Sequence, residues 1–183
     1  ILTDGYTAGD NVLYIWRKEM PERQLLYGIP LEKRTKDQQI KLPGIGTCNF
    51  TPDGKGLLFR SNLFSDEGNV SYLSLDDPAN VIEMPVSGLQ HKGVGELVEV
   101  KLVDADLFLL EYNIDGCSWL YECRYLENEG SGRLEVERTL CGLPPLDEGV
   151  LLGVEFELQE TAGEPNIAYV LSFSKANSPA QLY

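Results

Sequence analysis

The chain has 183 residues, with 15 Lys and Arg against 29 Asp and Glu, a formal net charge of −14 and one histidine. This length is typical of one domain, and 43% hydrophobic with 24% charged residues is typical of a folded chain rather than a disordered one. An acidic surface repels nucleic-acid phosphates and anionic membranes, so we expect neither as a partner. His91 alone cannot supply a multi-histidine metal site.

Short hydrophobic runs, separated by Gly, Asp, Asn and Pro, follow one another along the chain and predict antiparallel strands. Helical periodicity is nearly absent, so we predict an all-β chain. The clearest runs cover residues 12–16, 25–31, 57–60, 70–75, 98–103, 107–112, 119–126, 133–140, 150–158 and 167–173. Further strands over 39–42, 81–86 and 134–140 are expected to close successive units.

These units repeat. Each opens with a turn: Asp53-Gly54-Lys55 follows Pro52 in one copy, and Ala8-Gly9-Asp10, Asp104-Ala105-Asp106 and Pro165-Asn166 hold the same place in the others. A tyrosine then follows the strand. In three copies, a residue of the first strand and the tyrosine of the next lie thirteen positions apart: Tyr14–Tyr27, Phe59–Tyr72 and Val170–Tyr183. In the remaining copy, which contains Tyr121, the hairpin is two residues shorter.

Four strands in roughly 45–50 residues are typical of one blade of a β-propeller. We predict blades over 7–45, 46–90 and 91–145 and an incomplete blade over 146–183, with residues 1–6 as the tail of an outer strand. This gives about three and a half blades in a partial ring. A β-sandwich is the alternative. Because an open ring leaves strand edges bare, we expect either a piece of a longer propeller or a homo-oligomer formed through the open blade edges.

The start and the cysteines give two weaker expectations. The chain begins at Ile1 without a signal region, so we expect that an upstream segment was removed or that the chain is a piece of something longer. Hydrophobic runs are far shorter than the ~20 residues of a membrane span.

The four cysteines, Cys48, Cys117, Cys123 and Cys141, lack Cys-x-x-Cys spacing. They are read as small buried hydrophobic residues, and a disulfide between Cys117 and Cys123 is left open. We predict a cytoplasmic location, without excluding an extracytoplasmic one.

Three segments carry a family resemblance: Leu2-Thr3-Asp4-Gly5, residues 51–62 (TPDGKGLLFRSN) and residues 172–183 (SFSKANSPAQLY). They resemble the propeller of prolyl oligopeptidase-family serine peptidases, with TolB-like propeller repeats as the nearest relative. The closing Ser-Pro-Ala-Gln-Leu-Tyr is the more specific part, because the Pro-Asp-Gly turn also occurs in TolB-like propellers. In the predicted blades one, three and four, the Pro-Asp-Gly turn is replaced by Ala8-Gly9, Asp104-Ala105 and Pro165-Asn166.

The resemblance implies a non-catalytic propeller domain that gates the access of short peptides to an α/β-hydrolase domain outside this chain. No Gly-x-Ser-x-Gly elbow occurs, and Gly130-Ser131-Gly132 is read as a loop. His91 is read as a surface-loop residue because no nucleophile or carboxylate partner is identifiable. We therefore predict no catalytic, cofactor-binding or metal-binding residue in this chain, and no cofactor.

The remaining polar and aromatic residues have structural interpretations. Glu96 with Glu99, and Glu135 with Glu137, are read as solvated positions. The acidic turns Asp76-Asp77 and Asp104-Ala105-Asp106 are read as turn formers rather than calcium ligands. The large aromatic side chains are expected to pack between blades; these are Trp16, Trp119, Tyr14, Tyr27, Tyr72 and Tyr121.

Two other functions stay open. A stand-alone TolB- or WD-like propeller would act as a protein-interaction scaffold, although Trp-Asp and Gly-His dipeptides are missing from the sequence. An enzyme with its site in the propeller tunnel, such as a lyase or glycosidase, would need several convergent charged residues on inner strands.

Overall fold

The computed structural model describes residues 1–7, 9–127, 132–161 and 164–183. The described residues form an all-β fold with one short 3-10 helix, η1 (Leu31–Lys33), and no α-helix. The strands are β1 (Leu2–Thr7), β2 (Asp10–Ile15), β3 (Gln24–Tyr27), β4 (Asn49–Phe50), β5 (Gly56–Ser61), β6 (Asn69–Ser74), β7 (Val81–Glu83), β8 (Val86–Ser87), β9 (Gly95–Asp104), β10 (Leu107–Ile114), β11 (Cys117–Leu126), β12 (Arg133–Cys141), β13 (Gly149–Thr161), β14 (Glu164–Lys175) and β15 (Ser178–Leu182).

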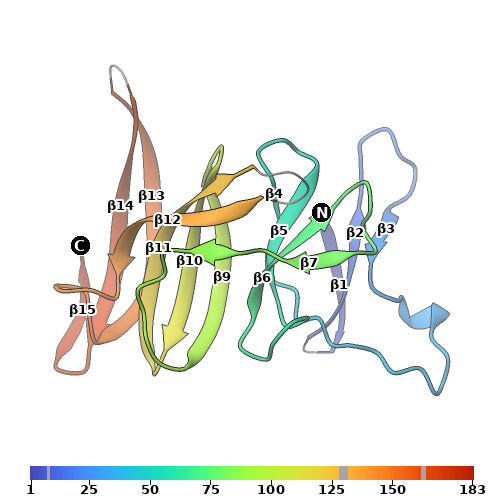
Figure 1. Cartoon of the computed structure of the whole chain (residues 1–183), viewed down its shortest axis with the longest axis horizontal. Helices are drawn as coiled ribbons and strands as arrows, with labels where there is room; N and C mark the ends of the chain where they lie inside the picture. The colour runs from blue at the N-terminus through green and yellow to red at the C-terminus, as the bar shows by residue number, and fades with distance from the viewer. Residues whose placement is uncertain (8, 128–131, 162–163) are drawn as a thin grey trace.

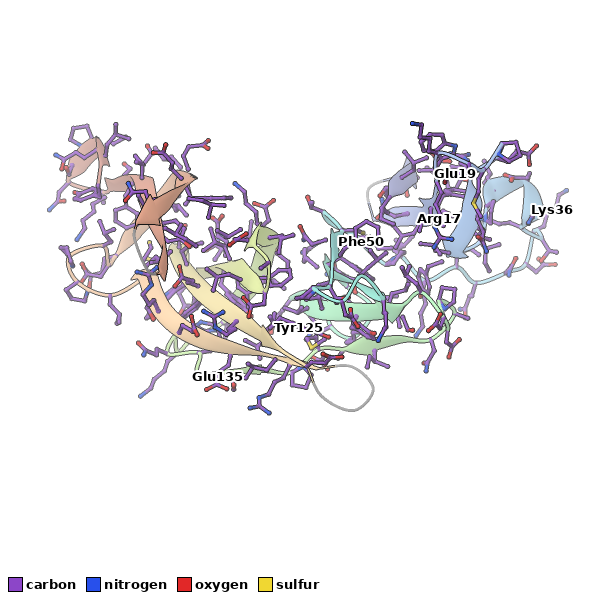
Figure 2. All side chains as sticks on the ribbon, turned by 90° about the horizontal axis from the view of Figure 1, so that it is seen from above. Arg17, Glu19, Lys36, Phe50, Tyr125 and Glu135 are labelled. Atoms are coloured by element: carbon purple, nitrogen blue, oxygen red, sulfur yellow. The ribbon has the colours of Figure 1, made fainter. Side chains whose placement is uncertain are left out.

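Four sheets follow one another along the long axis of the molecule (Figure 1). Sheet A has the order β1-β2-β3, sheet B β4-β5-β6-β7, sheet C β8-β12-β11-β10-β9 and sheet D β13-β14-β15. Seen from above, the row is curved, with the outline of a half-barrel (Figure 2). The predicted all-β class is confirmed.

Successive sheets pack face to face, and each contact has its own hydrophobic cluster. Leu57 and Phe59 on β5 join the cluster between sheets A and B, whereas Leu58 joins the cluster between sheets B and C. On β10, Phe108 packs toward sheet B and Leu109 toward sheet D. Alternate residues of a strand point to opposite faces, so a strand covered on both faces reads as an unbroken hydrophobic run. This explains the sequences Leu-Leu-Phe in β5 and Leu-Phe-Leu-Leu in β10.

In each of the four sheets, a leucine on one strand (β2, β5, β10 or β14) lies opposite a tyrosine on or just after the next strand along the chain (β3, β6, β11 or β15). Three pairs are set by the strand register, Leu13–Tyr27, Leu58–Tyr72 and Leu110–Tyr121; in the fourth, Leu171 and Tyr183 exchange two backbone hydrogen bonds of 3.0 and 2.9 Å. The thirteen-residue spacing of the sequence does not mark these partners, because Tyr14 pairs with Leu25 and Phe59 pairs with Ser71.

The pairs do not all face the same way. Leu58 and Tyr72 point from sheet B toward sheet C, but Leu110 and Tyr121 point from sheet C back toward sheet B, so both tyrosines lie in one cluster. Leu171 likewise points back, from sheet D toward sheet C. A shift of one residue along a strand moves a side chain to the other face. The sheets share a pairing, therefore, without being simple copies of one another.

Several predicted elements are wrong in detail. Residues 1–6 are not the tail of an outer strand of a separate blade, because β1 pairs with β2 inside sheet A. Residues 39–42 form no strand; Leu42 is 55% exposed, and such a segment has no hydrophobic face to bury. Pro165-Asn166 is not a turn but lies inside β14, paired with residues 159–160.

The closing strand predicted over 81–86 is divided between two sheets. β7 pairs with β6 at the edge of sheet B, and β8 pairs in parallel with β12 at the edge of sheet C. Met84 and Pro85 lie between them, and proline has no N–H to continue a ladder. The Pro85 carbonyl accepts a hydrogen bond from the Leu134 N–H (2.9 Å), which draws the chain over to sheet C. Sheets B and C are thus joined through a shared edge segment.

Candidate functional site

A cavity of about 490 Å³ lies between sheets B and C. Its floor is hydrophobic and includes Val70, Met84 and Leu97, which are at most 2% exposed. Glu67 and Glu83, both exposed, belong to its lining. Cavities of this size are in the range that holds small organic ligands. The cavity is therefore the candidate site.

His91 lines the same cavity and packs against three aromatic rings. Its ring centroid lies 4.8 Å from Tyr112, 5.8 Å from Trp119 and 5.7 Å from Tyr121. Tyr112 and Trp119 lie directly opposite each other on β10 and β11. Because Tyr121 is two residues beyond Trp119 on the same strand, it shares their face.

The Tyr121 hydroxyl fixes the tautomer of His91. Its oxygen accepts backbone N–H groups of Gln90 (3.3 Å) and His91 (3.0 Å) and lies 2.9 Å from the His91 Nδ1. With both lone pairs used, the hydroxyl must donate its proton to Nδ1. This assigns His91 as the neutral imidazole with its proton on Nε2.

Burial shifts the pKa values of these groups in the same sense. Desolvation lowers the pKa of His91 and raises the pKa of Tyr121, and it raises the pKa of Tyr112 strongly. Burial disfavours each charged form. The aromatic cluster is therefore neutral near pH 7, and the charge of the cavity lining comes from carboxylates.

A short polar chain forms one wall of the cavity. The Ser65 hydroxyl donates to the Asn69 Oδ1 (2.7 Å), and the Asn69 amide donates to Glu83. Within the described residues, neither Glu67 nor Glu83 forms an ion pair. The nearby Arg60 guanidinium is held by the Leu97 and Gly44 carbonyls, at 2.9 and 3.1 Å. The carboxylates of this wall are thus free to meet a cation.

The structure places the predicted residues as follows. His91 lies in a loop, as predicted, but its ring is half-buried in the aromatic cluster rather than free at the surface. The hydrogen bonds of its side chain within the described residues go to Tyr121, not to a serine or a carboxylate. Of Gly130-Ser131-Gly132, the first two lie outside the described residues. No group of three or more His, Cys, Asp or Glu in the described ranges could hold a metal ion.

None of the paired glutamates belongs to the lining of the cavity. Arg124 binds Glu137 through two hydrogen bonds of 2.6 and 3.1 Å and also pairs with Asp106. Glu135 is exposed on the convex side of the row (Figure 2). Glu96 lies 3.9 Å from Arg60.

The acidic turns are found where they were expected, unlike Pro165-Asn166, and Ala8 of the turn predicted over 8–10 lies outside the described residues. Asp53 accepts hydrogen bonds from the Thr51 hydroxyl (2.6 Å) and the Lys55 N–H (3.0 Å) ahead of β5. Asp104 and Leu107 are the paired ends of β9 and β10. Asp76 and Asp77 follow β6 in a bend.

The aromatic prediction holds for some residues and fails for others. Tyr72 and Tyr121 are buried between sheets B and C, with Trp119 packed against them, and Tyr27 packs between sheets A and B. Trp16 is 52% exposed, so the predicted packing is wrong there. Tyr14 is covered by the guanidinium of Arg23, 4.0 Å from the ring centre.

All four cysteines are free thiols. Cys117 and Cys123 lie six residues apart on β11, which corresponds to about 20 Å along a strand, so the disulfide left open by the sequence is excluded. Burial raises the pKa values of Cys48, Cys123 and Cys141 to about 12, as expected for unreactive buried thiols.

A second polar cluster lies between sheets C and D. Glu122 is 3% exposed and accepts two hydrogen bonds from Arg138, both 2.6 Å, and a third from the Tyr169 hydroxyl. Every described buried side-chain nitrogen or oxygen has a hydrogen-bond partner. Because Glu122 is fully occupied by its partners, this cluster is structural.

Sequence reasoning missed the aromatic cluster around His91. The alternation of Trp119 and Tyr121 along one strand indicates a shared aromatic face, but His91 is separated from Tyr121 by thirty positions. Its arrival at that face depends on the loop after β8, which no local pattern predicts.

Comparison with protein-family models, with curated proteins and with solved structures gives no match. No described helix is long and apolar enough to cross a membrane.

Proposed function

We propose that this chain is a non-catalytic β-propeller module of a prolyl oligopeptidase-like serine peptidase, which gates the access of short peptides to a catalytic domain outside this chain. The observation that supports it best is the curved row of four β-sheets with a common Leu–Tyr pairing. In this proposal the blades cover about 7–45, 46–90, 91–145 and 146–183, the first blade gaining β1.

The chemistry of the cavity fits gating better than catalysis. His91 is oriented by a tyrosine hydroxyl and is neutral, and a triad histidine needs a carboxylate on one nitrogen and a nucleophile on the other. The cavity wall offers carboxylates and a hydrophobic floor, which are binding groups. A module of this kind selects substrates by their charge and size.

The test is capture followed by activity labelling. The chain serves as bait, and captured polypeptides are treated with a fluorophosphonate that reacts only with active serine hydrolases. We expect a labelled α/β-hydrolase partner. Added back to that partner, the chain should slow cleavage of a long substrate such as casein and leave a dipeptide amide unaffected. Equal effects on both substrates, or capture of unlabelled proteins alone, would contradict the proposal.

The second candidate is an interaction scaffold of the TolB or WD kind. It is favoured by the outer face of sheet D, where Val150, Val170 and Leu182 are 45%, 48% and 74% exposed. An exposed hydrophobic face of this kind is typical of a contact with another protein. A captured partner that the fluorophosphonate does not label, and that V170D releases, would favour the scaffold.

A further inference from the structure

We propose that the cavity between sheets B and C binds an organic monocation with a hydrophobic body, such as an aryl-alkyl ammonium group. The proposal does not rest on the proposed function, because it concerns only this chain and its own cavity.

The cavity provides two different environments for such a ligand. Val86 and Leu89 are half-buried and give the lining hydrophobic surface that a ligand can reach, alongside the buried side chains of Val70, Met84 and Leu97. The rings of His91 and Tyr112, 4.8 Å apart, line the cavity beside this surface. A hydrophobic chain or ring gains from leaving water for surfaces of this kind, and an aromatic ring also attracts a cation to its face.

The charge of the lining selects for a cation. Glu67 and Glu83 are the acidic side chains of the lining, and within the described residues neither forms an ion pair. The groups around His91 add no positive charge: Tyr112 and Tyr121 are neutral, and burial lowers the pKa of His91 itself. Lys92, its exposed chain neighbour, is not part of the lining. An anion would therefore meet repulsion, and a neutral ligand would leave the carboxylates without a cationic partner.

The probes are 4-phenylbutylamine, its neutral analogue 4-phenylbutan-1-ol and the anion 4-phenylbutyrate, titrated by calorimetry into the chain at pH 7.5. The three share one hydrophobic body. We expect the amine to bind about twofold to fivefold more tightly than the alcohol, the range of an exposed charge contact, and the anion to bind most weakly. Tryptophan fluorescence follows the same titration, because Trp119 touches His91.

The double variant E67Q/E83Q tests the carboxylates. Both side chains are exposed, so the fold is expected to persist; circular dichroism checks it. The affinity for the amine should fall to that for the alcohol, while the affinity for the alcohol stays the same. E155Q/E157Q is the matched control: it removes the same charge from the outer face of sheet D and should leave all three affinities unchanged.

Four outcomes would overturn the proposal. They are equal affinity for the amine and the alcohol, an equal loss of amine affinity in both double variants, loss of amine and alcohol affinity together in E67Q/E83Q, and no binding of the amine at about 10 mM, where even a millimolar site would be largely filled.

Discussion

Sheet C is covered on both faces, by sheet B on one side and by sheet D on the other, and the two contacts differ in the side chains that they bury. One strand, β11, serves both. Tyr121 and Cys123 point toward sheet B, into a cluster of leucine, phenylalanine and tyrosine side chains. Leu120 and Glu122 point toward sheet D, where the carboxylate meets Arg138 and Tyr169. Alternation along one strand thus places a hydrophobic cluster on one face of β11 and a hydrophobic cluster with a buried carboxylate on the other.

The difference shows what each contact contributes. A hydrophobic contact is non-directional and stabilises in proportion to the area removed from water. A buried carboxylate stabilises little on balance, but it is costly when it lacks partners. Both contacts gain stability from their hydrophobic clusters. In addition, the buried carboxylate and its partners fix the position of sheet D relative to sheet C, whereas the contact between sheets B and C leaves room for a cavity.

The largest effect is expected at the hydrophobic contact. Phe108 is 0% exposed and lies between sheets B and C. F108A should lower the free energy of unfolding by about 3–5 kcal/mol, because it removes buried surface and leaves a cavity. Urea denaturation measures it. V170A, at a half-exposed valine of sheet D, should change stability by about 0.5 kcal/mol or less. Similar losses in both variants would show that sheets B and C are not packed against each other.

A smaller effect is expected at the polar contact. R138M leaves the buried Glu122 carboxylate with Tyr169 as its remaining strong partner and should cost about 1–3 kcal/mol. R133M, which breaks the exposed Arg133–Glu135 pair, is the control and should cost about 0–1 kcal/mol. Equal costs in urea denaturation would mean that Glu122 is solvated.

The same contact predicts an acid dependence. Burial opposes ionisation of Glu122, but the hydrogen bonds from Arg138 and Tyr169 and the nearby arginine charges outweigh it, so its pKa is lowered. A lowered carboxyl pKa stabilises the fold above the unfolded pKa, near 4.3, and this stabilisation is lost as the pH falls through the folded pKa. Between pH 6 and pH 3, E122Q should therefore lose less stability than the wild-type chain. An identical acid profile in both would remove Glu122 as the cause.

Much of the fold could be predicted because its strands and turns are determined by residues that lie close together in the sequence. The hydrophobic runs of β5 and β10, the turn at Asp53-Gly54 and the hairpin at Asp104–Leu107 are each determined by neighbours in sequence. The repeated tyrosine spacing indicated repeated hairpins, but it did not identify the leucine that lies opposite each tyrosine.

What failed depends on contacts between distant segments. A local reading cannot show that residues 81–87 change sheets, because the change is made by a hydrogen bond from Leu134 to Pro85. Nor can it show that Tyr121 faces backward, since a one-residue shift relative to sheet B reverses its face. The site around His91 failed for the same reason, as its partners come from β10 and β11.

The smallest predicted effect concerns His91. Its titration changes the stability of the contact between sheets B and C at a higher pH than the titration of Glu122 changes the contact between sheets C and D. Burial lowers the pKa of His91 below the unfolded value of about 6.5, so the stability linked to it is complete above that value and is lost as the pH falls through the folded pKa. Protonation also places a second donor against the Tyr121 hydroxyl, which already donates to Nδ1. H91N keeps an acceptor near that position but does not titrate. Between pH 7.5 and pH 5, above the titration of Glu122, the wild-type Tm should fall more than that of H91N. Parallel Tm curves would mean that the imidazole is solvated, and that the hydrophobic contact between sheets B and C does not extend to the wall of the cavity.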